Sequence, residues 1–400
     1  MTNNQLAING GAPVRTAPFP DWPIADEREE RLLLEVLYSG KWGIMQGDKV
    51  RIFQEQFAAY QGARYALCVP NGTLALQLAL MALGVKPGDE VIVPAYTFIA
   101  TVSSALQLGA RPVFVDIDPD SYTLDPAKIE AAITPKTKAI IPVHLGGRPA
   151  DMDGMLEVAR PHGLAVLEDA CQAWGAEWRG QRVGAIGSLG AFSFQSSKNI
   201  TAGEGGALVT NDEALYETCW SLHNVGRTRT GAWYFHDLLG LNLRMTEWQG
   251  AILIAQLGRV DEHFPRREDS ARYLSQELAR LGGLSALPDH PDVTRNARHL
   301  LILRYNAAAF GGQPLPEFVK ALEAEGITPI SQGYVPLHHS PAIRKTMQAL
   351  FDVDPAQTTL PCTEQAASQT LWIQQTALLG TRQDMDDIVS AVEKIQNAWR

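Results

Sequence analysis

The chain has 400 residues, 46% hydrophobic and 20% charged, which is enough to bury a large core and to form one large and one smaller domain. A net charge of −10 without a basic stripe argues against nucleic acid or an anionic membrane as the main partner. The four cysteines form no CxxC pair, and no signal-peptide pattern or transmembrane-length apolar run is present. The sequence therefore predicts a cytoplasmic protein with reduced thiols.

The first predicted elements are an extended arm and two helices. The segment up to residue 23 is rich in Gly and Pro, which favours an extended chain. Asp26 is a favourable N-cap for a helix that ends at Gly40. A second amphipathic helix is predicted over residues 53–60 and ends at Gly62.

Short apolar runs then alternate with helical stretches from residue 65 to 209, a pattern typical of a sheet built from β-α-β units. Asp125 and Pro126 predict the start of one of the helices. The predicted strands are residues 66–69, 90–93, 112–115, 139–143, 165–168 and 190–194, with residues 206–210 as an antiparallel neighbour. We expect an α/β fold with a mostly parallel seven-stranded sheet in the large domain.

The first strand leads into a candidate phosphate site. Asn71, Gly72 and Thr73 precede an apolar helical pattern. Backbone N–H groups at a helix start, the close approach that Gly72 allows and the Thr73 hydroxyl suit a phosphate group. The same three residues also form an ordinary turn and N-cap.

The strand predicted at residues 165–168 delivers a carboxylate to the carboxyl edge of the sheet. Asp169 at this edge can pair with a protonated heterocyclic nitrogen, and Gln172 can hydrogen-bond a neighbouring phenolic oxygen. The alternative is that Asp169 caps a helix.

Lys198 follows the strand at residues 190–194, within a polar step that ends in a glycine-rich turn. Partial desolvation at such a step lowers the pKa of a lysine and makes the neutral amine available to an aldehyde. The alternative is a solvated loop lysine. A phosphate site, an anion for a ring nitrogen and a lysine for an aldehyde together match the three groups through which pyridoxal phosphate is bound.

These stretches resemble the DegT/StrS family of pyridoxal-phosphate aminotransferases, fold-type-I enzymes that aminate keto-sugars and keto-cyclitols. The similarity runs in order from the first strand to the end of the large domain. The matching stretches are NGTLALQLAL, PAYTFIAT, PVFVDID, PVHLGG, EDACQAWGA, FSFQSSKNITAGEGG and GLNLRMTEWQGAI.

The resemblance implies further roles. Phe98 is expected to stack on the cofactor ring, and Ser193 to bind its phosphate. Asn242 and Arg244 lie in a segment that in the family reaches the partner subunit's phosphate, which implies a homodimer with shared active sites. Trp42 lies in a loop that in the family covers the active site, where it either touches substrate or packs on the arm.

Trp174 departs from the family, because many relatives carry His at this position. The departure leaves Asp169 and Gln172 intact, but it removes any expectation of substrate contact at position 174. Some family members replace the catalytic lysine with His and become dehydratases. Lys198 therefore favours amino transfer.

From residue 260 the sequence pattern changes to charged helical stretches. This change predicts an arm and large cofactor-binding domain over residues 1–259 and a smaller α/β domain over residues 260–400. In the smaller domain we predict helices at residues 261–281 and 316–326 and a strand at residues 299–305. Tyr334, His338 and His339 lie on a loop that could face substrate. No Cys or carboxylate stands at metal-ligand spacing from these histidines, so no metal site is predicted.

The resemblance implies transfer of an amino group from glutamine or glutamate to a keto-cyclitol or keto-sugar. The opening INGGAPVRTAPFPDWP and the stretch SFQSSKNITAGEGG followed by SLHNVGR are most similar to members that act on scyllo-inosose-type ketones with glutamine as donor, as in antibiotic biosynthesis. Aminohydroxybenzoate synthases are the nearest alternative, and enzymes of nucleotide-linked keto-sugars come third. A pyridoxal-phosphate lyase or dehydratase also stays open at this point.

Overall fold

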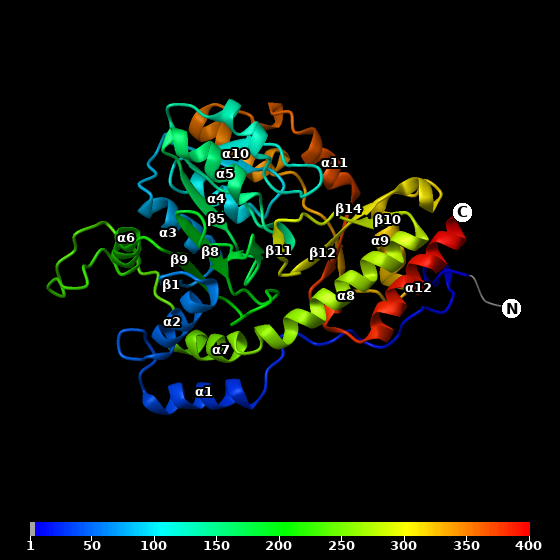
Figure 1. The fold of residues 1–400 in the computed structure, drawn as a ribbon, viewed down its shortest axis with the longest axis horizontal. Coiled ribbons are helices and arrows are strands. Elements are labelled where there is room, and N and C mark those ends of the chain that lie inside the picture. The colour runs from blue at the N-terminus through cyan, green and yellow to red at the C-terminus, as the bar shows by residue number, and fades with distance from the viewer. Residues whose placement is uncertain (1–4) are drawn as a thin grey trace.

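The computed structural model describes residues 5–400 and contains a seven-stranded sheet in the order β1-β9-β8-β5-β4-β2-β3 (Figure 1). β9 is antiparallel to both of its neighbours, and the other adjacent pairs are parallel. The strands are β1 (Tyr65–Val69), β2 (Glu90–Pro94), β3 (Arg111–Val115), β4 (Thr137–Ile140), β5 (Ala165–Asp169), β8 (Leu189–Ser193) and β9 (Gly206–Thr210). The predicted sheet and its antiparallel member are confirmed.

Both faces of this sheet are buried, because successive strand residues point to opposite sides. Phe192 of β8 packs on one face with Phe57, at 5.0 Å between ring centroids, whereas Ala191 belongs to the core on the other face. The first face is covered by α2 (Lys49–Gln61), α5 (Met152–Ala159) and α7 (Glu247–Leu257), and the second by α3 (Gly72–Ala82), α4 (Ile99–Leu106) and α6 (Glu213–His223). Double burial explains why the strands are continuous apolar runs in the sequence.

A second, antiparallel sheet of four strands has the order β10-β12-β14-β13. Its strands are β10 (Leu284–Ala286), β12 (Leu300–Tyr305), β13 (Ile330–Gln332) and β14 (Thr370–Gln374). A separate core joins it to α8 (Val260–Leu281), α9 (Leu315–Ala324) and α12 (Arg382–Trp399). The remaining elements are α10 (Pro341–Phe351), α11 (Pro361–Gln369) and a small sheet of β6 (Glu177–Trp178), β7 (Gln181–Arg182) and β11 (Val293–Arg295). The domain division at residues 259 and 260 stays a prediction.

The helix predicted from Asp125 is confirmed at its start, but it is not an α-helix. The chain there forms two three-residue 3-10 turns, η2 (Pro126–Lys128) and η3 (Glu130–Ala132). Asp125 does act as a cap, because its carboxylate accepts a hydrogen bond from the Ala127 N–H at 3.0 Å. Ile133, the residue after η3, is already extended, and Pro135 disfavours helical geometry at Thr134.

The N-terminal arm runs from the part of the chain that contains the four-stranded sheet to the part that contains the seven-stranded sheet. Leu6 lies in the core of the four-stranded sheet, and Arg15 pairs with Asp384 and Asp387 of α12, each at 2.7 Å. In Figure 1 the arm then passes beneath α8 to reach α1 (Glu27–Ser39). As predicted, Asp26 caps α1, and Gly40 ends it in the left-handed conformation that favours glycine. None of the helices in residues 5–400 is long and apolar enough to cross a membrane.

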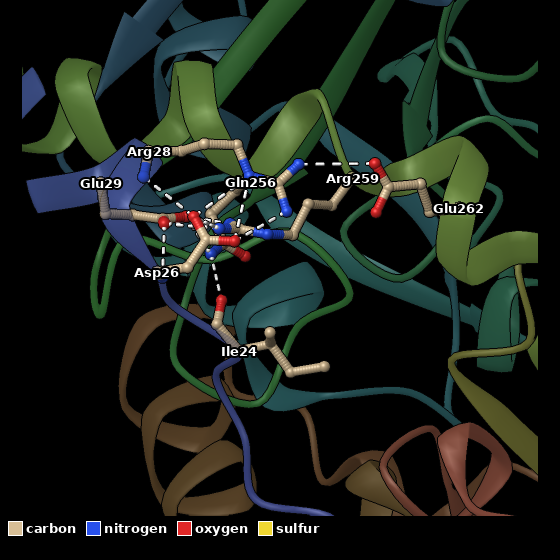
Figure 2. A network of polar contacts seen from close by, with 7 residues as sticks. All are labelled: Ile24, Asp26, Arg28, Glu29, Gln256, Arg259 and Glu262. Atoms are coloured by element: carbon tan, nitrogen blue, oxygen red, sulfur yellow. Dashed lines mark hydrogen bonds and ion pairs between the residues drawn. The ribbon is translucent and has the colours of Figure 1, made fainter. Parts of the chain in front are cut away.

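A buried ion-pair network fixes α1 against the junction of α7 and α8 (Figure 2). Arg259, in this junction, pairs with Glu29 of α1 and with Asp26, the latter at 2.6 Å. Gln256 donates hydrogen bonds to Glu29 and to the Ile24 carbonyl, both at 2.8 Å. Burial alone would raise the pKa of Glu29, but hydrogen bonds from Arg259 lower it below its usual value. Arg259 and Glu29 therefore form a hydrogen-bonded, buried charge pair that holds α1 in place.

We expect Arg259→Met to lower the free energy of unfolding by about 3–5 kcal/mol, because it leaves the Glu29 carboxylate buried without its cation. Urea denaturation measures the loss. The exposed pair Arg31–Glu35 on the same helix provides the control, and Arg31→Met should cost at most about 1 kcal/mol. Equal losses in the two variants would show that the network does not stabilise the fold.

Candidate active site

A cavity of about 1100 Å³ lies between the two large sheets, at the carboxyl ends of β5 and β8 and the start of α3. Residues of β12, β13 and β14, and residues next to β12 and β14, form the opposite wall. The predicted site residues that line this cavity are Gly72, Thr73, Phe98, Asp169, Gln172, Ser193 and Lys198. The fold therefore brings together segments that are more than a hundred residues apart in the chain.

Asp169 is the last residue of β5 and is buried at the cavity wall. Thr101 Oγ1 donates a hydrogen bond to Asp169 Oδ2 at 2.7 Å, and the Cys171 N–H donates to Oδ1 at 3.2 Å. No helix begins here, because residues 170–176 form turns. The alternative that Asp169 is a helix cap is therefore wrong.

The preceding residue, Glu168, points to the opposite side of β5 and anchors the end of the strand. Its carboxylate accepts a hydrogen bond from His144 Nε2 at 3.0 Å, and His144 Nδ1 accepts one from the Ala150 N–H. It also accepts from three backbone N–H groups, those of Gly184, Ile186 and Gly187, at 2.6–2.8 Å. Because both oxygens of the Glu168 carboxylate accept hydrogen bonds, the buried carboxylate is satisfied and holds the strand end that carries Asp169.

Lys198 lies in a tight turn after β8, closed by its own N–H donating to the Gln195 carbonyl at 2.9 Å. The residue is half-buried and lines the cavity. Desolvation lowers the pKa of Lys198 below its usual value, whereas Cys171 and Asp169 act in the opposite direction. The Lys198 amine is thus more readily neutral than a solvated loop lysine, as the sequence suggested.

The start of α3 leaves two donors free. Asn71 caps the helix by accepting from the Leu74 N–H at 2.9 Å, while the N–H groups of Gly72 and Thr73 donate to no other described residue. A Cβ on Gly72 would lie 2.8 Å from Ser193 Cβ, so only glycine allows this approach. The Ser193 hydroxyl therefore lies beside two free N–H groups at a helix N-terminus, an arrangement suited to an anion.

Gln172 is held at both ends of its amide. Its Oε1 accepts from the Gly146 N–H at 2.7 Å, and its Nε2 donates to the Tyr334 hydroxyl at 3.0 Å. Tyr334 also lines the cavity, so the predicted loop does reach the site through this residue. Phe98 is about half exposed on the cavity wall, as a residue available for stacking would be.

His299 is a buried cavity residue that the sequence analysis missed. Asn199 Nδ2 donates to the Ala297 carbonyl, which leaves Asn199 Oδ1 to accept from His299 Nδ1 at 3.1 Å. Burial, Lys198 and Arg267 lower the pKa of His299 well below its usual value, so the ring is neutral with a lone pair at Nε2. A histidine at the start of a strand in the C-terminal part has no spacing relation to Lys198 that a sequence pattern could show.

Asn242 and Arg244 are not among the residues that line this cavity. Asn242 is exposed, and Arg244 donates to Asn224 Oδ1 at 2.8 Å. Arg244 forms no ion pair with any acidic side chain in residues 5–400. Burial and the nearby Arg227 lower the pKa of Arg244. The two residues are therefore not part of the site formed by their own chain.

The other residues that the sequence suggested as possible substrate contacts, apart from Tyr334, lie outside the cavity lining. Trp42 packs on Trp248 of α7, with ring centroids 5.7 Å apart, and it is not among the cavity residues. Trp174 is buried behind the wall, in edge contact with His299. His338 and His339 do not line the cavity either.

The comparisons with known proteins agree with this geometry. The DegT/DnrJ/EryC1/StrS aminotransferase family model matches residues 23–393. An L-glutamine:2-deoxy-scyllo-inosose aminotransferase from Streptoalloteichus tenebrarius is 40% identical over an alignment of 418 residues, which covers 98% of this chain and 97% of that enzyme. A 3-amino-5-hydroxybenzoate synthase from Amycolatopsis mediterranei is 45% identical over 295 residues, covering 72% of this chain and 76% of that enzyme.

Among solved structures, a 3-amino-5-hydroxybenzoic acid synthase matches with a TM-score of 0.86 at 36% identity, covering 96% of this chain and 99% of the other. The fold and the residues around the cavity thus define a fold-type-I aminotransferase. The chain belongs to the DegT/DnrJ/EryC1/StrS aminotransferase family, which confirms the resemblance seen in the sequence.

We expect the reactivity of Lys198 in cofactor-free protein to rise with pH through a midpoint below the usual lysine value of 10.5, because the pKa of this residue is lowered. Amine acylation followed by peptide mass spectrometry measures the midpoint. Asp169→Asn should move it further down, since the Asp169 carboxylate raises the pKa of Lys198. A midpoint at or above the usual value, or an upward shift in the variant, would contradict the desolvated environment.

Proposed function

We propose that the protein uses pyridoxal phosphate to transfer an amino group from glutamine or glutamate to a polyhydroxylated cyclic ketone of the scyllo-inosose type. The phosphate fits the start of α3, where the N–H groups of Gly72 and Thr73 are free and a Cβ on Gly72 would meet Ser193. Because the helix N-terminus favours negative charge, these groups would hold the phosphate without a cation from the same chain.

The ring of the cofactor would be held by residues from three elements. Asp169 is ionisable and already oriented by Thr101, so it would pair with a protonated ring nitrogen. Phe98 offers an exposed aromatic face for stacking. Gln172 retains one N–H beyond its bond to Tyr334, which is free to donate to a phenolic oxygen.

When bound, pyridoxal phosphate supplies an aldehyde for the amino group and an electron sink for a developing negative charge. Lys198 would bind the aldehyde carbon through Nζ. After the donor amine displaces it, the neutral Lys198 Nζ would accept the proton from the donor α-carbon and deliver it to the carbon that carried the aldehyde. Its lowered pKa favours the neutral form that this step needs.

The charged and polar residues of the cavity wall are the observation that supports the proposed acceptor. The acidic and basic residues that line it are Asp169, Glu204, Lys198 and His299, and among residues 5–400 no arginine does. The rest of the polar wall consists largely of amides and hydroxyls, including Gln107, Gln195, Gln374, Gln375, Ser331 and Thr376. Such groups match the hydroxyls of a neutral cyclitol, whereas a nucleotide diphosphate or a carboxylate calls for a cation.

A second candidate is an aminohydroxybenzoate-synthase-like activity, which the 45% identity to the Amycolatopsis mediterranei enzyme favours. Its aminodehydroshikimate-type substrate carries a carboxylate. A wall without arginine supports the neutral ketone instead, as does the L-glutamine:2-deoxy-scyllo-inosose name of the relative that matches 98% of this chain.

The test is to load the amino form of the cofactor and to follow its visible absorption with each ketone class. We expect scyllo-inosose-type ketones to restore the absorption of the lysine-bound form, with Lys198→Ala as the inactive control. Restoration only by aminodehydroshikimate or by nucleotide-linked keto-sugars would reject the proposed acceptor. Loss of water or release of a keto acid without amino transfer would reject the reaction.

Asp169→Asn should slow amino transfer on the order of a thousandfold, because it removes the charge that stabilises the protonated ring nitrogen. The amide can still accept from Thr101, so the fold is expected to persist. Single-turnover rates at saturating cofactor measure the effect. Thr101→Ser keeps the hydroxyl and should act within about threefold of the parent rate. Normal turnover by Asp169→Asn would remove the residue from the proposed site.

We further propose a homodimer in which Asn242 and Arg244 reach the phosphate of the partner subunit. Arg244 and the nearby Arg227 have no carboxylate partner in the described chain, so they form a basic group that an anion can satisfy. The buried Ser221 Oγ, His223 Nε2 and Asn224 Nδ2 beside them have no hydrogen-bond partner within residues 5–400. The polar network is thus incomplete in a single chain.

The segment between α6 and α7 supports this dimer. It extends away from the body of the molecule in Figure 1, and its apolar side chains are strongly exposed, with Tyr234 at 86% and Leu239 at 95%. Exposed apolar groups of this size are typical of a protein interface. A second copy of the chain would cover them while it brings Arg244 to the phosphate site.

Mixing inactive Lys198→Ala chains with inactive Asn242→Ala/Arg244→Ala chains should restore part of the activity, because one site of the heterodimer has both contributions. Activity after subunit exchange measures the effect, and each variant alone is the control. No restoration despite demonstrated exchange, or a monomer by light scattering, would contradict a shared site.

A further inference from the structure

Three side chains meet outside the active site, two from the loop that follows Tyr334 and one from α11. His338 and His339 lie in the 3-10 turn η7 (Leu337–His339), and Glu364 lies in the first turn of α11. The Nε2 atoms of His338 and His339 are 2.9 Å and 2.7 Å from the same oxygen, Glu364 Oε1. The carboxylate that the sequence lacked at metal spacing is thus supplied by a distant helix.

The ligand types in this cluster and the spacing of the ligand atoms suit a transition-metal ion. Imidazole nitrogen and carboxylate oxygen both bind Zn²⁺, usually with four ligands. All three ligand atoms lie within 4.8 Å of one another, which includes the spacing of about 3.3 Å between neighbouring ligands in a tetrahedral zinc site. To take up an ion, the two Nε2–Oε1 distances would lengthen from 2.9 Å and 2.7 Å towards this spacing.

Exposure and hydrogen bonding agree with an accessible site. The side chains of His339 and Glu364 are nearly half exposed, so a water molecule can occupy a fourth position. His338 is buried, and its Nδ1 has no hydrogen-bond partner in residues 5–400. Its proton can therefore move to Nδ1 without breaking a protein hydrogen bond there, which leaves the Nε2 lone pair for a metal.

The backbone that carries Glu364 is held in a fixed position. Asp116 accepts hydrogen bonds from the N–H groups of Cys362 and Thr363 and so fixes the start of the helix that carries Glu364.

We propose that His338, His339 and Glu364 bind one divalent transition-metal ion of the zinc type in each chain. The ion would connect η7 to α11 in place of the present hydrogen bonds. Because η7 follows the segment that carries Tyr334, and the Leu337 N–H donates to the Ala95 carbonyl at 2.9 Å, the ion would stabilise one wall of the cavity. Its role would be structural, since neither histidine lines the cavity.

The test uses untagged, cofactor-loaded protein freed of metal by a chelator and titrated with Zn²⁺ in a calorimeter. We expect one ion per chain and a higher thermal midpoint at saturation, as for any ligand that binds only the folded state. His339→Gln and Glu364→Gln should each weaken binding at least about tenfold. Both residues are exposed, so neither substitution should prevent folding.

His162→Gln is the matched control, because His162 and Glu130 form an exposed pair at 3.0 Å without a third ligand. This variant should bind Zn²⁺ like the parent protein. The visible absorption of the cofactor reports any ion that enters the active site instead. Absence of saturable binding, or binding that His339→Gln and Glu364→Gln leave unchanged, would overturn the proposal and show that the three residues form only a hydrogen-bonded cluster.

Discussion

Burial of both faces of the seven-stranded sheet is the constraint on which the site depends. Val166 and Leu167 of β5 enter different cores, so neither face of the strand has room for an unpaired polar group. Polar side chains can reach open space only where a strand ends. Asp169 and Ser193, the last residues of β5 and β8, occupy these ends, and the cavity forms there because the sheet excludes it elsewhere.

Some buried or partly buried charged groups of the protein are paired and others are not, and this division separates structural roles from the proposed functional ones. Arg259 is buried but paired with Glu29, and Glu168 accepts several hydrogen bonds, so both stabilise the fold. Lys198 is desolvated without a direct ion pair, and Arg244 has no acidic partner in residues 5–400. A charge that the chain leaves unpaired is available to a cofactor, a substrate or a second subunit.

The cavity wall shows how one fold can serve different acceptors. The β5 and β8 side holds the residues proposed to bind the cofactor, whereas Trp372, Gln374 and Gln375 come from β14 and the residue after it. The second sheet therefore supplies much of the cavity surface that would meet the proposed substrate. Changes there can alter the acceptor without disturbing the lysine and the carboxylate, which agrees with relatives of one fold that carry different substrate names.

The sequence by itself determined the large sheet, the cap at Asp26 and the segments around Gly72, Asp169 and Lys198, because strand periodicity, capping and turn chemistry act between near neighbours. It predicted a helix after Asp125, where the chain forms only two short 3-10 turns. Only the tertiary structure decided which distant groups meet. His299 bonds Asn199 across 100 positions, and Glu364 joins His338 and His339 from another helix. Such meetings depend on how layers pack, and no local spacing encodes them.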